Sequence, residues 1–332
     1  ETGAASPALV TDVNRSGSME VFETTFSDGG MVRCTIDHWM PGVTRSGKSQ
    51  VSHGVTIPVL PKKRRFVEYI GSTSNAVSCR HRFLSPVSID YLNVGELPLH
   101  PYVVGALLGG GSLNKDHVVI TTADEGILQK ILSLTPGLVE KAVPHKKGFC
   151  FTLYQVKDGK YGLLSNALRE IGLARQTCEM KHIPERYLTA SEDDRLELLA
   201  GLVDTDGTHN DFTQKSERLT RDFARLVRSL GGKATVYRER RVCTNAPGGP
   251  KEGWYWRCSW RLNRRLPLVL DRKQPRISKR AVDYLKRVIR RIESVGMMDC
   301  GCITVDHPSH CFVAYDWVAV GNSEGVGGYE VV

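Results

Sequence analysis

Several features that would restrict this chain to familiar classes of protein are missing. Its 332 residues contain no apolar run of 18 residues and no visible signal peptide, so the sequence predicts no membrane-spanning helix and no membrane partner. The nine cysteines form no Cys-x-x-Cys pair, and the spacing of Cys300 and Cys302 does not suit a zinc site. We therefore expect reduced thiols and a cytoplasmic protein.

The most informative stretch is residues 199–207, Leu-Ala-Gly-Leu-Val-Asp-Thr-Asp-Gly. Ala200 and Gly201 have little or no side chain, which allows a second helix to approach closely. Gly207 suits the left-handed position that ends many helices. The pattern thus predicts a buried helix with Asp206 at its C-terminal end, and an ordinary core helix with a glycine cap is the alternative.

This nonapeptide resembles the signature of the LAGLIDADG homing endonucleases at nearly every position. In that family two such helices pack side by side, and the acid at the end of each holds a divalent metal over the scissile phosphate. The resemblance implies double-stranded DNA as a partner, Mg²⁺ as the cofactor of the nuclease and Asp206 as a catalytic metal ligand.

A second copy of the motif occupies residues 103–111, Val-Val-Gly-Ala-Leu-Leu-Gly-Gly-Gly. Gly105 matches Gly201 and Gly111 matches Gly207, but Gly110 stands where Asp206 has its carboxylate. This copy keeps the packing chemistry and lacks the acid. We therefore expect impaired DNA cleavage, and both nicking of one strand and binding without cleavage are open.

The segments after each motif alternate between helical and strand-like patterns. The resemblance implies two αββαββα repeats whose sheets lie in the DNA major groove. Residues 233–291 carry 18 Lys and Arg against 4 Asp and Glu, and aromatic residues interleave with these bases; a solvated basic face is the alternative. The expected DNA-binding residues are Lys215, Arg238, Arg240, Arg241, Arg257 and Arg261. By family resemblance, Lys181 and Lys273 are further catalytic candidates, and a plain surface lysine is the alternative for each.

The C-terminal region, residues 302–323, has two strand-like runs around His310 and ends in Asn322 and Ser323. It resembles the last two sequence blocks of an intein, a segment that excises itself from a host protein and joins the flanks. The resemblance implies that Asn322 cyclises on its own carbonyl, that Ser323 carries the ester and that His310 is the acid-base group. The histidine that usually precedes the asparagine is replaced by Gly321.

A matching block lies upstream, where Thr35, Asp37 and His38 resemble the intein element that polarises the upstream splice junction. A structural histidine in a β domain is the alternative. Cys302 takes a place where a subclass of inteins has its first nucleophile, but neighbouring positions match that subclass only in part. Cys302 is therefore a candidate branch nucleophile, with a small buried thiol as the alternative.

The first intein block, a Cys or Ser nucleophile before Gly-Asp-Thr, is absent. We expect the C-terminal part of a split intein that splices in trans with a separate N-terminal fragment, and a truncated chain is the alternative. The predicted fold is mixed: an all-β Hint-type splicing domain with an inserted α/β LAGLIDADG endonuclease. The splicing domain spans residues 1–97 and 281–322, the endonuclease spans 98–280, and residues 323–332 begin the host extein.

Splicing of this kind needs no cofactor. The resemblance implies host-protein exteins as partners and a microbial or phage-borne origin. One alternative from another class is a free-standing LAGLIDADG endonuclease or DNA-binding protein without splicing, for which the C-terminal residues are dispensable. Another is a degenerate element that splices but no longer cuts DNA.

Overall fold

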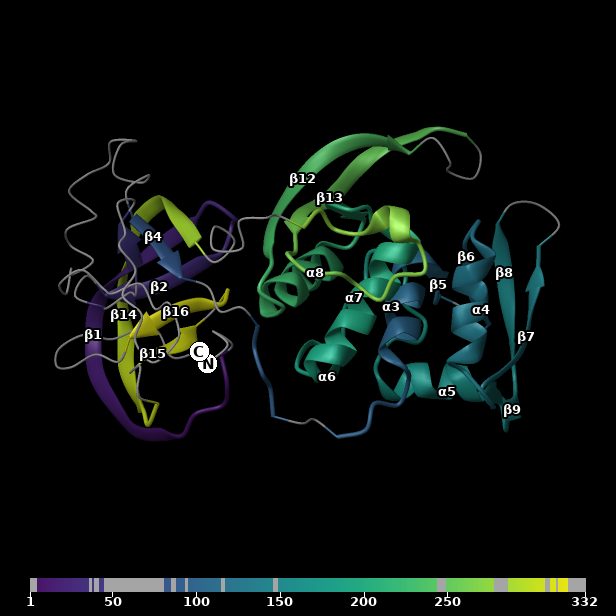
Figure 1. Ribbon diagram of the computed structural model, residues 1–332, viewed down its shortest axis with the longest axis horizontal. Helices are drawn as coiled ribbons and strands as arrows, with labels where there is room; N and C mark the ends of the chain where they lie inside the picture. Colours follow the sequence, from purple (N-terminus) through teal and green to yellow (C-terminus); the bar gives the residue numbers. More distant parts are fainter. Residues whose placement is uncertain are drawn as a thin grey trace. The chain divides into compact units, whose positions relative to one another are not determined.

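The computed structural model divides the chain into two compact units (Figure 1). One is the discontinuous unit Glu1–Asp90 with Lys279–Val332, called here the β unit; the other is Tyr91–Ser278, called the α/β unit. The sequence placed these boundaries after residues 97 and 280. The structure describes residues 5–35, 38, 42–44, 81–84, 88–92, 95–114, 117–145, 149–243, 249–277, 286–307, 311–314 and 316–321.

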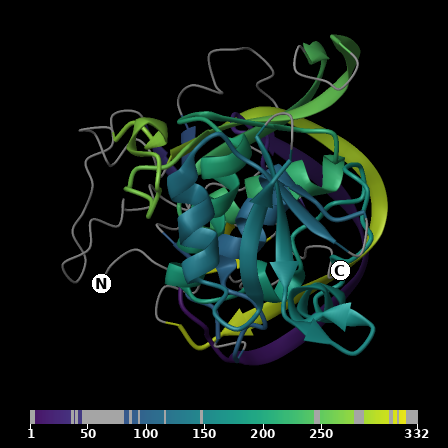
Figure 2. The same ribbon diagram turned by 90° about the vertical axis from the view of Figure 1, so that its right-hand side faces the viewer.

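The β unit is organised by two long strands from opposite ends of the sequence. Strand β1 (Val10–Phe26) pairs antiparallel with β14 (Lys286–Val305), from Val10 opposite Val305 to Phe26 opposite Ile289. The purple and yellow bands follow each other in both views (Figure 1 and Figure 2). Gly17 and Gly296 lie at register shifts with positive φ, a conformation that costs glycine little, so each permits a bulge in the ladder.

The remaining strands of the β unit complete a five-stranded antiparallel sheet in the order β2-β1-β14-β4-β3 and a separate hairpin of β15 with β16. Their bounds are β2 Met31–Thr35, β3 Gly42–Thr44, β4 His81–Leu84, β15 Cys311–Ala314 and β16 Val318–Gly321. The fully buried cluster comprises Phe26, Val32, Cys34, Cys302, Val318 and Val320. The hairpin therefore shares one core with the long strands.

Two helices form the centre of the α/β unit, and their backbones touch. They are α3 (Pro101–Gly110) and α7 (Glu192–Asp206), which carry the two motif copies. A Cβ atom added to Gly105 would lie 2.2 Å from the Leu198 carbonyl oxygen, and one added to Gly201 would lie 2.2 Å from the Tyr102 carbonyl oxygen. Only hydrogen fits at these points, so the predicted close approach of the two helices is confirmed.

Each central helix is followed by its own antiparallel sheet, in the orders β5-β6-β8-β7 and β11-β13-β12. The strands are β5 Gly111–Ser112, β6 Val118–Thr121, β7 Val139–Pro144, β8 Cys150–Gln155, β11 Asp211–Gln214, β12 Lys233–Cys243 and β13 Lys251–Arg261, with a small hairpin of β9 Lys157–Asp158 and β10 Tyr161–Gly162. The helices are α4 Glu125–Ser133, α5 Leu163–Glu170, α6 Glu185–Leu188, α8 Glu217–Ser229 and the 3-10 helix η1 Asp271–Lys273.

The two halves are not identical repeats. The first half follows the predicted αββαββα order, apart from the small hairpin before α5. The second half has one strand, β11, between α7 and α8 and ends in the η1 turn, so the predicted repeat is wrong there. An isolated bridge between Gly207 and Phe212 stands where the first half has its extra strand.

Helix α8 covers one face of the second sheet. Phe223 of α8 stacks on Phe212 with ring centroids 4.2 Å apart and meets Trp260 edge-on at 5.8 Å. Residues of both halves join one buried cluster, so the α/β unit has a single core. Among the described residues, no helix is both long and apolar enough to cross a membrane.

Candidate functional site

The glycine after each central helix is required by crowding. Gly207 has φ −97° and ψ 172° and Gly111 has φ −88° and ψ 153°, both extended, so the predicted left-handed cap at Gly207 is wrong. A Cβ on Gly207 would lie 2.7 Å from the Cα of Val203, and one on Gly111 would lie 2.3 Å from the Leu107 carbonyl oxygen. The chain therefore turns back against its own helix, which only glycine allows.

The two acids of the second motif have different environments. Asp204 is buried and accepts hydrogen bonds from the Tyr102 hydroxyl at 2.9 Å and the backbone N–H groups of Val269 at 2.8 Å and Leu270 at 3.0 Å. Asp206 is exposed and accepts a hydrogen bond from the Gln214 side-chain amide. Asp204 thus fastens the helix in place, while Asp206 reaches the surface at the helix end.

Asp206 reaches the surface, but the protein around its carboxylate removes water that would stabilise the charge. Burial by the surrounding protein raises its pKa to about 7, against the opposing charges of Lys181 and Lys273 and the Gln214 hydrogen bond. Lys181 is itself buried, which lowers its pKa to about 8. Near neutral pH both groups are close to their titration points, a property typical of functional sites.

The two lysines have equivalent places in the two halves. Lys181 Nζ donates hydrogen bonds to the carbonyl oxygens of Leu108 and Gly111, both at 2.7 Å, at the end of α3. Lys273 Nζ donates to the carbonyl oxygens of Val203 at 2.9 Å and Asp204 at 2.7 Å, at the end of α7. Each lysine therefore neutralises the negative end of one central helix.

The first motif has no acid at this site, and its glycines are needed for packing. A Cβ on Gly109 would lie 2.1 Å from Thr205 Oγ1, and one on Gly110 would lie 2.8 Å from the Thr121 carbonyl oxygen. Both glycines thus allow the end of α7 and the neighbouring strand to approach α3. An aspartate at position 110 would need the backbone near Thr121 to shift.

The site has a single carboxylate at the helix ends, Asp206, and this limits how many metal ions it can bind. Among the described residues there is no group of three His, Cys, Asp or Glu side chains placed to bind a metal. Mg²⁺ commonly takes one or two carboxylates together with water and substrate phosphate. Asp206, at the end of α7, offers one carboxylate to such an ion, and Gly110 offers no side chain for a second.

The six predicted DNA-binding residues divide between two faces of the second sheet. Alternation along β12 and β13 places Arg241, Arg257 and Arg261 on one face and Arg238 and Arg240 on the other. Lys215 follows β11, with its ammonium 5.8 Å from the Tyr255 ring. The sequence did not predict this division, because it requires the strand register.

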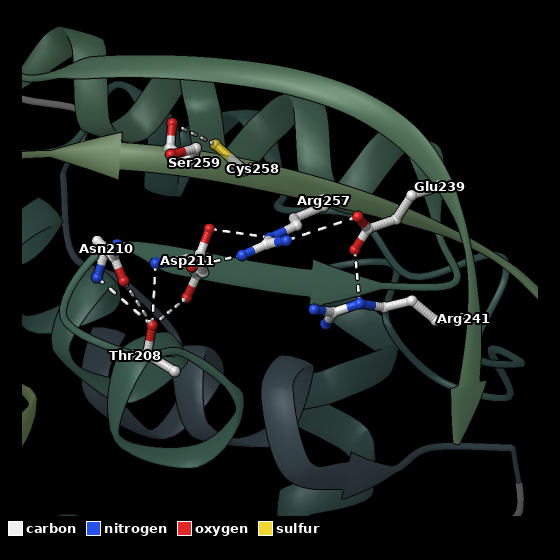
Figure 3. A network of polar contacts seen from close by, with 8 residues as sticks. All are labelled: Thr208, Asn210, Asp211, Glu239, Arg241, Arg257, Cys258 and Ser259. Atoms are coloured by element: carbon white, nitrogen blue, oxygen red, sulfur yellow. Dashed lines mark hydrogen bonds and ion pairs between the residues drawn. The ribbon is translucent and has the colours of Figure 1, made fainter. Parts of the chain in front are cut away.

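Arg257 is held by acids on its own face. Its guanidinium makes a bidentate ion pair with Asp211, at 2.9 and 2.7 Å, and lies 3.5 Å from Glu239 (Figure 3). Arg241 binds the other oxygen of Glu239 at 2.6 Å. The two arginines and two acids largely cancel in charge, so Arg257 offers less to a phosphate than its residue type suggests.

In the β unit, two predicted splicing residues lie together in the core. Thr35 and His38 are both 1% exposed, and the His38 backbone N–H donates to the Thr35 carbonyl oxygen at 3.1 Å. Burial lowers the pKa of His38 to about 4, so its imidazole is neutral at physiological pH. Asp37, His310, Asn322 and Ser323 lie outside the described residues.

The strand pairing of the C-terminal hairpin involves the sequence neighbours of two of these residues. Cys311 of β15 pairs with Gly321 of β16. In the sequence, His310 immediately precedes the first of these and Asn322 immediately follows the second. Cys302 is 7% exposed, belongs to the β-unit core and donates a weak hydrogen bond to the Ile303 carbonyl oxygen at 3.6 Å.

Two further groups escaped the sequence analysis. Gln214, the donor to Asp206, occupies the last position of the short strand after the motif, and only the fold brings it back to the acid. Arg287, 1% exposed, forms a buried ion pair with Asp28 at 3.0 Å and donates to the Asp316 carbonyl oxygen at 2.6 Å. It ties the β1–β2 turn to the turn of the C-terminal hairpin.

Comparison with known proteins gives one distant similarity. No protein-family model matches the chain. The chain is 27% identical over 315 residues to the replicative DNA helicase DnaB of Mycobacterium intracellulare, a match that covers 88% of this chain and 48% of the helicase. The chain thus spans about half the length of this relative.

The helicase similarity draws attention to residues 42–49, Gly-Val-Thr-Arg-Ser-Gly-Lys-Ser, which match the phosphate-binding pattern Gly-x4-Gly-Lys-Ser. This pattern is not among the features predicted above from the sequence. In a nucleotide-binding loop the pattern follows a strand and opens a helix. Here its first three residues are the strand β3, paired antiparallel with β4, and the others lie outside the described residues. The described part of the pattern is therefore a strand and not a loop.

Proposed function

We propose that this chain is the C-terminal part of a split intein that splices in trans with a separate N-terminal fragment, in which the β unit belongs to a Hint-type splicing domain and the α/β unit is an inserted LAGLIDADG endonuclease with one metal-binding acid. The observation that carries the proposal is the insertion itself. Both ends of the chain build one β unit through the β1–β14 ladder, and a separately folded unit with paired motif helices lies between them in the sequence.

The proposed splicing chemistry uses Asn322, Ser323 and His310. The pairing of Cys311 with Gly321 supports it, because His310 and Asn322 are the sequence neighbours of these two paired residues. Asn322 would cyclise and cut the chain behind it, with His310 as acid-base group and Ser323 as the ester-bearing hydroxyl. Thr35 and the neutral imidazole of His38 would polarise the upstream amide.

In the α/β unit, Asp206 would hold Mg²⁺, which when bound supplies charge stabilisation at a scissile phosphate. Lys181 and Lys273 fix the helix ends on either side, and Gln214 orients the Asp206 carboxylate. Because position 110 has no acid, we expect nicking or binding rather than cleavage of both strands.

The similarity to a replicative DNA helicase supports a proposal about the host. The matched relative contains a segment resembling most of this chain and about as much sequence again. We propose that the flanks joined by splicing belong to such a helicase. The competing interpretation, that this chain itself uses ATP, would require a nucleotide-binding loop where β3 forms a strand.

The splicing proposal is tested by release of the residues after Asn322. The chain is fused after residue 332 to a small carrier protein, incubated at neutral pH with and without candidate N-terminal intein fragments, and analysed by mass spectrometry. We expect a carrier fragment that begins at Ser323 and a partner that ends in a succinimide. Asn322→Ala should abolish release, whereas Asn263→Ala, in the other unit, should not. Release at the same rate from Asn322→Ala would refute the proposal.

A further inference from the structure

The far end of the β12–β13 ribbon carries an unusual surface on the side opposite the Arg257 network. The ribbon extends beyond α8 (Figure 1). On this side Trp254 is 56% exposed and Val242 is 56% exposed, although both are large apolar residues. They lie diagonally across the strand pair, because Val242 pairs with Glu252 and Arg240 pairs with Trp254.

Arginines and tryptophans alternate along this surface, here called the Trp–Arg ladder and defined by Arg221, Trp256, Arg238 and Trp254. The guanidinium of Arg238 lies 4.8 Å from the Trp254 ring and 5.9 Å from the Trp256 ring. Arg221 of α8 lies 5.6 Å from Trp256 on the inner side. These distances are within the range of cation–π attraction.

The outer end of the ladder keeps its positive charge. On the opposite face Arg257 is paired with Asp211, and on the same face Arg240 is paired with Glu252 at 3.0 Å. Among the described residues no acid lies within ion-pair distance of Arg238, which is exposed. The Arg238 cation contacts two rings, and one of them, the Trp254 indole, is exposed. This pair suits a ligand that is both aromatic and anionic.

The inner end of the ladder is next to the candidate site. Gln214, Trp256 and Arg238 form one row across the three strands of the sheet. Neighbouring strands lie about 4.8 Å apart, so the row is short. Since Gln214 donates to Asp206, a chain bound along the ladder would run from the exposed ribbon towards the acid.

We propose that the Trp–Arg ladder binds single-stranded nucleic acid, with unpaired bases stacked on Trp254 and backbone phosphates paired with Arg238. Stacking on an exposed indole requires a free base face, which a duplex does not offer along its length. Arg238 lies against the Trp254 ring, so its charge can attract the phosphates next to the stacked base. This proposal depends on neither splicing nor DNA cleavage, and it assigns the ribbon a second function beyond contact with a duplex.

The test measures binding without chemistry. Fluorescence anisotropy in EDTA compares a labelled single strand of about 12 nucleotides with the duplex of the same sequence, since sites of this kind span about 4–16 nucleotides. We expect Trp254→Ala to weaken single-strand binding about tenfold and duplex binding less than about twofold. Trp254→Phe should restore most of the loss, because it keeps an aromatic face.

Charge is separated from stacking by two arginine variants on opposite faces. Arg238→Ala should weaken single-strand binding and reduce its salt slope by about one, whereas Arg241→Ala should mainly affect the duplex. Thermal melting checks that Trp254→Ala stays folded, which its exposure predicts.

Two results would overturn the proposal. One is unchanged single-strand affinity in Trp254→Ala. The other is an equal loss for single strand and duplex, which would make the ladder a general phosphate surface. Release of the carrier after Asn322, measured on the same samples, reports the β unit separately.

Discussion

The two halves of the α/β unit share their packing and differ in their chemistry. Each central helix has a glycine at the helix contact, a glycine that turns the chain back and a lysine on its last carbonyls. Only the second half has the acid. Its strands β11, β12 and β13 carry seven Lys and Arg and three Asp and Glu, whereas β5 to β8 carry one lysine and one glutamate.

This difference teaches that one scaffold of paired helices can carry an acid at the end of one helix and none at the end of the other. The helix contact is a single shared surface, so neither half can change it alone. The end of α3 has no acid, and Gly109 and Gly110 instead allow Thr205 and Thr121 to pack closely against it. The following predictions test how far the two halves are independent.

The largest effect on stability is expected at the contact between α3 and α7, where both halves have a glycine. Gly201→Ala places a Cβ atom 2.2 Å from the Tyr102 carbonyl oxygen and 2.7 Å from the Ala106 nitrogen, so the helices must separate. We expect a loss of about 3 kcal/mol or more in the free energy of unfolding, measured by urea denaturation. Gly105→Ala should cost a similar amount.

Gly253→Ala is the matched control, because the nearest atom to its added Cβ is a Tyr255 ring carbon at 3.6 Å, an ordinary contact. If Gly201→Ala were as stable as Gly253→Ala, the helix backbones would not be in the contact described.

The second prediction concerns the acid that one half lacks. In a plasmid assay with Mg²⁺ we expect slow formation of nicked circles, and Asp206→Asn should reduce it by about 100-fold or more through loss of the carboxylate ligand. Gly110→Asp should not produce linear DNA, since its Cβ would lie 2.8 Å from the Thr121 carbonyl oxygen. Linear DNA from Gly110→Asp would show that the halves differ only by a missing side chain.

The third prediction compares the lysines. Lys181 is 5% exposed and Lys273 is half-buried, although both bind carbonyl oxygens of a helix end. Lys181→Met should therefore lower the free energy of unfolding by about 2 kcal/mol and Lys273→Met by about 1 kcal/mol. Denaturant titration measures both, and Lys215→Met on the exposed sheet is the control. A larger cost at Lys273 would contradict the assigned burial.

The fourth prediction concerns pH. The Asp206 pKa rises from 3.8 in the unfolded chain to about 7, so the folded state binds more protons and stability falls as pH rises from about 4 to 7. The Lys181 pKa falls from 10.5 to about 8, so stability rises between about pH 8 and 10.5. Melting temperature should contain both contributions. Asp206→Asn should remove the acidic limb, and the alkaline limb should remain and begin at a lower pH, because the Asp206 charge raises the Lys181 pKa; persistence of the acidic limb would reassign it to another group.

Features within one segment of these halves are predicted well from the sequence, and contacts between segments are predicted poorly. The helix contact at Gly105 and Gly201 and the strands after each motif follow from residue size and alternation, which are local properties. The pairing of Arg257 with Asp211, the two faces of the ribbon and the return of Gln214 to Asp206 depend on strand register. No pattern within one segment encodes that register.

The same limit explains the corrections. Gly207 matched the usual left-handed helix cap, but whether a glycine is needed for its φ angle or for space depends on the atoms that surround it. The second half was predicted to repeat the first because helical and strand-like segments alternate after each motif. Its shorter strand arrangement depends on the segment 207–212, where a single bridge replaces a strand.

The smallest expected effect tests whether the basic half is partly neutralised. Asp211→Asn removes the negative charge that binds Arg257 through two hydrogen bonds. The fold should stay nearly unchanged, since Asp211 is on an edge strand. The freed guanidinium should add about one phosphate contact, so the slope of log affinity against log salt for duplex DNA should steepen by about one. Glu252→Gln, which frees Arg240 on the opposite face, is the matched control and should leave the duplex slope unchanged. An equal change in both variants would mean that the duplex contacts both faces of the ribbon, and the division between its faces would then have no functional meaning.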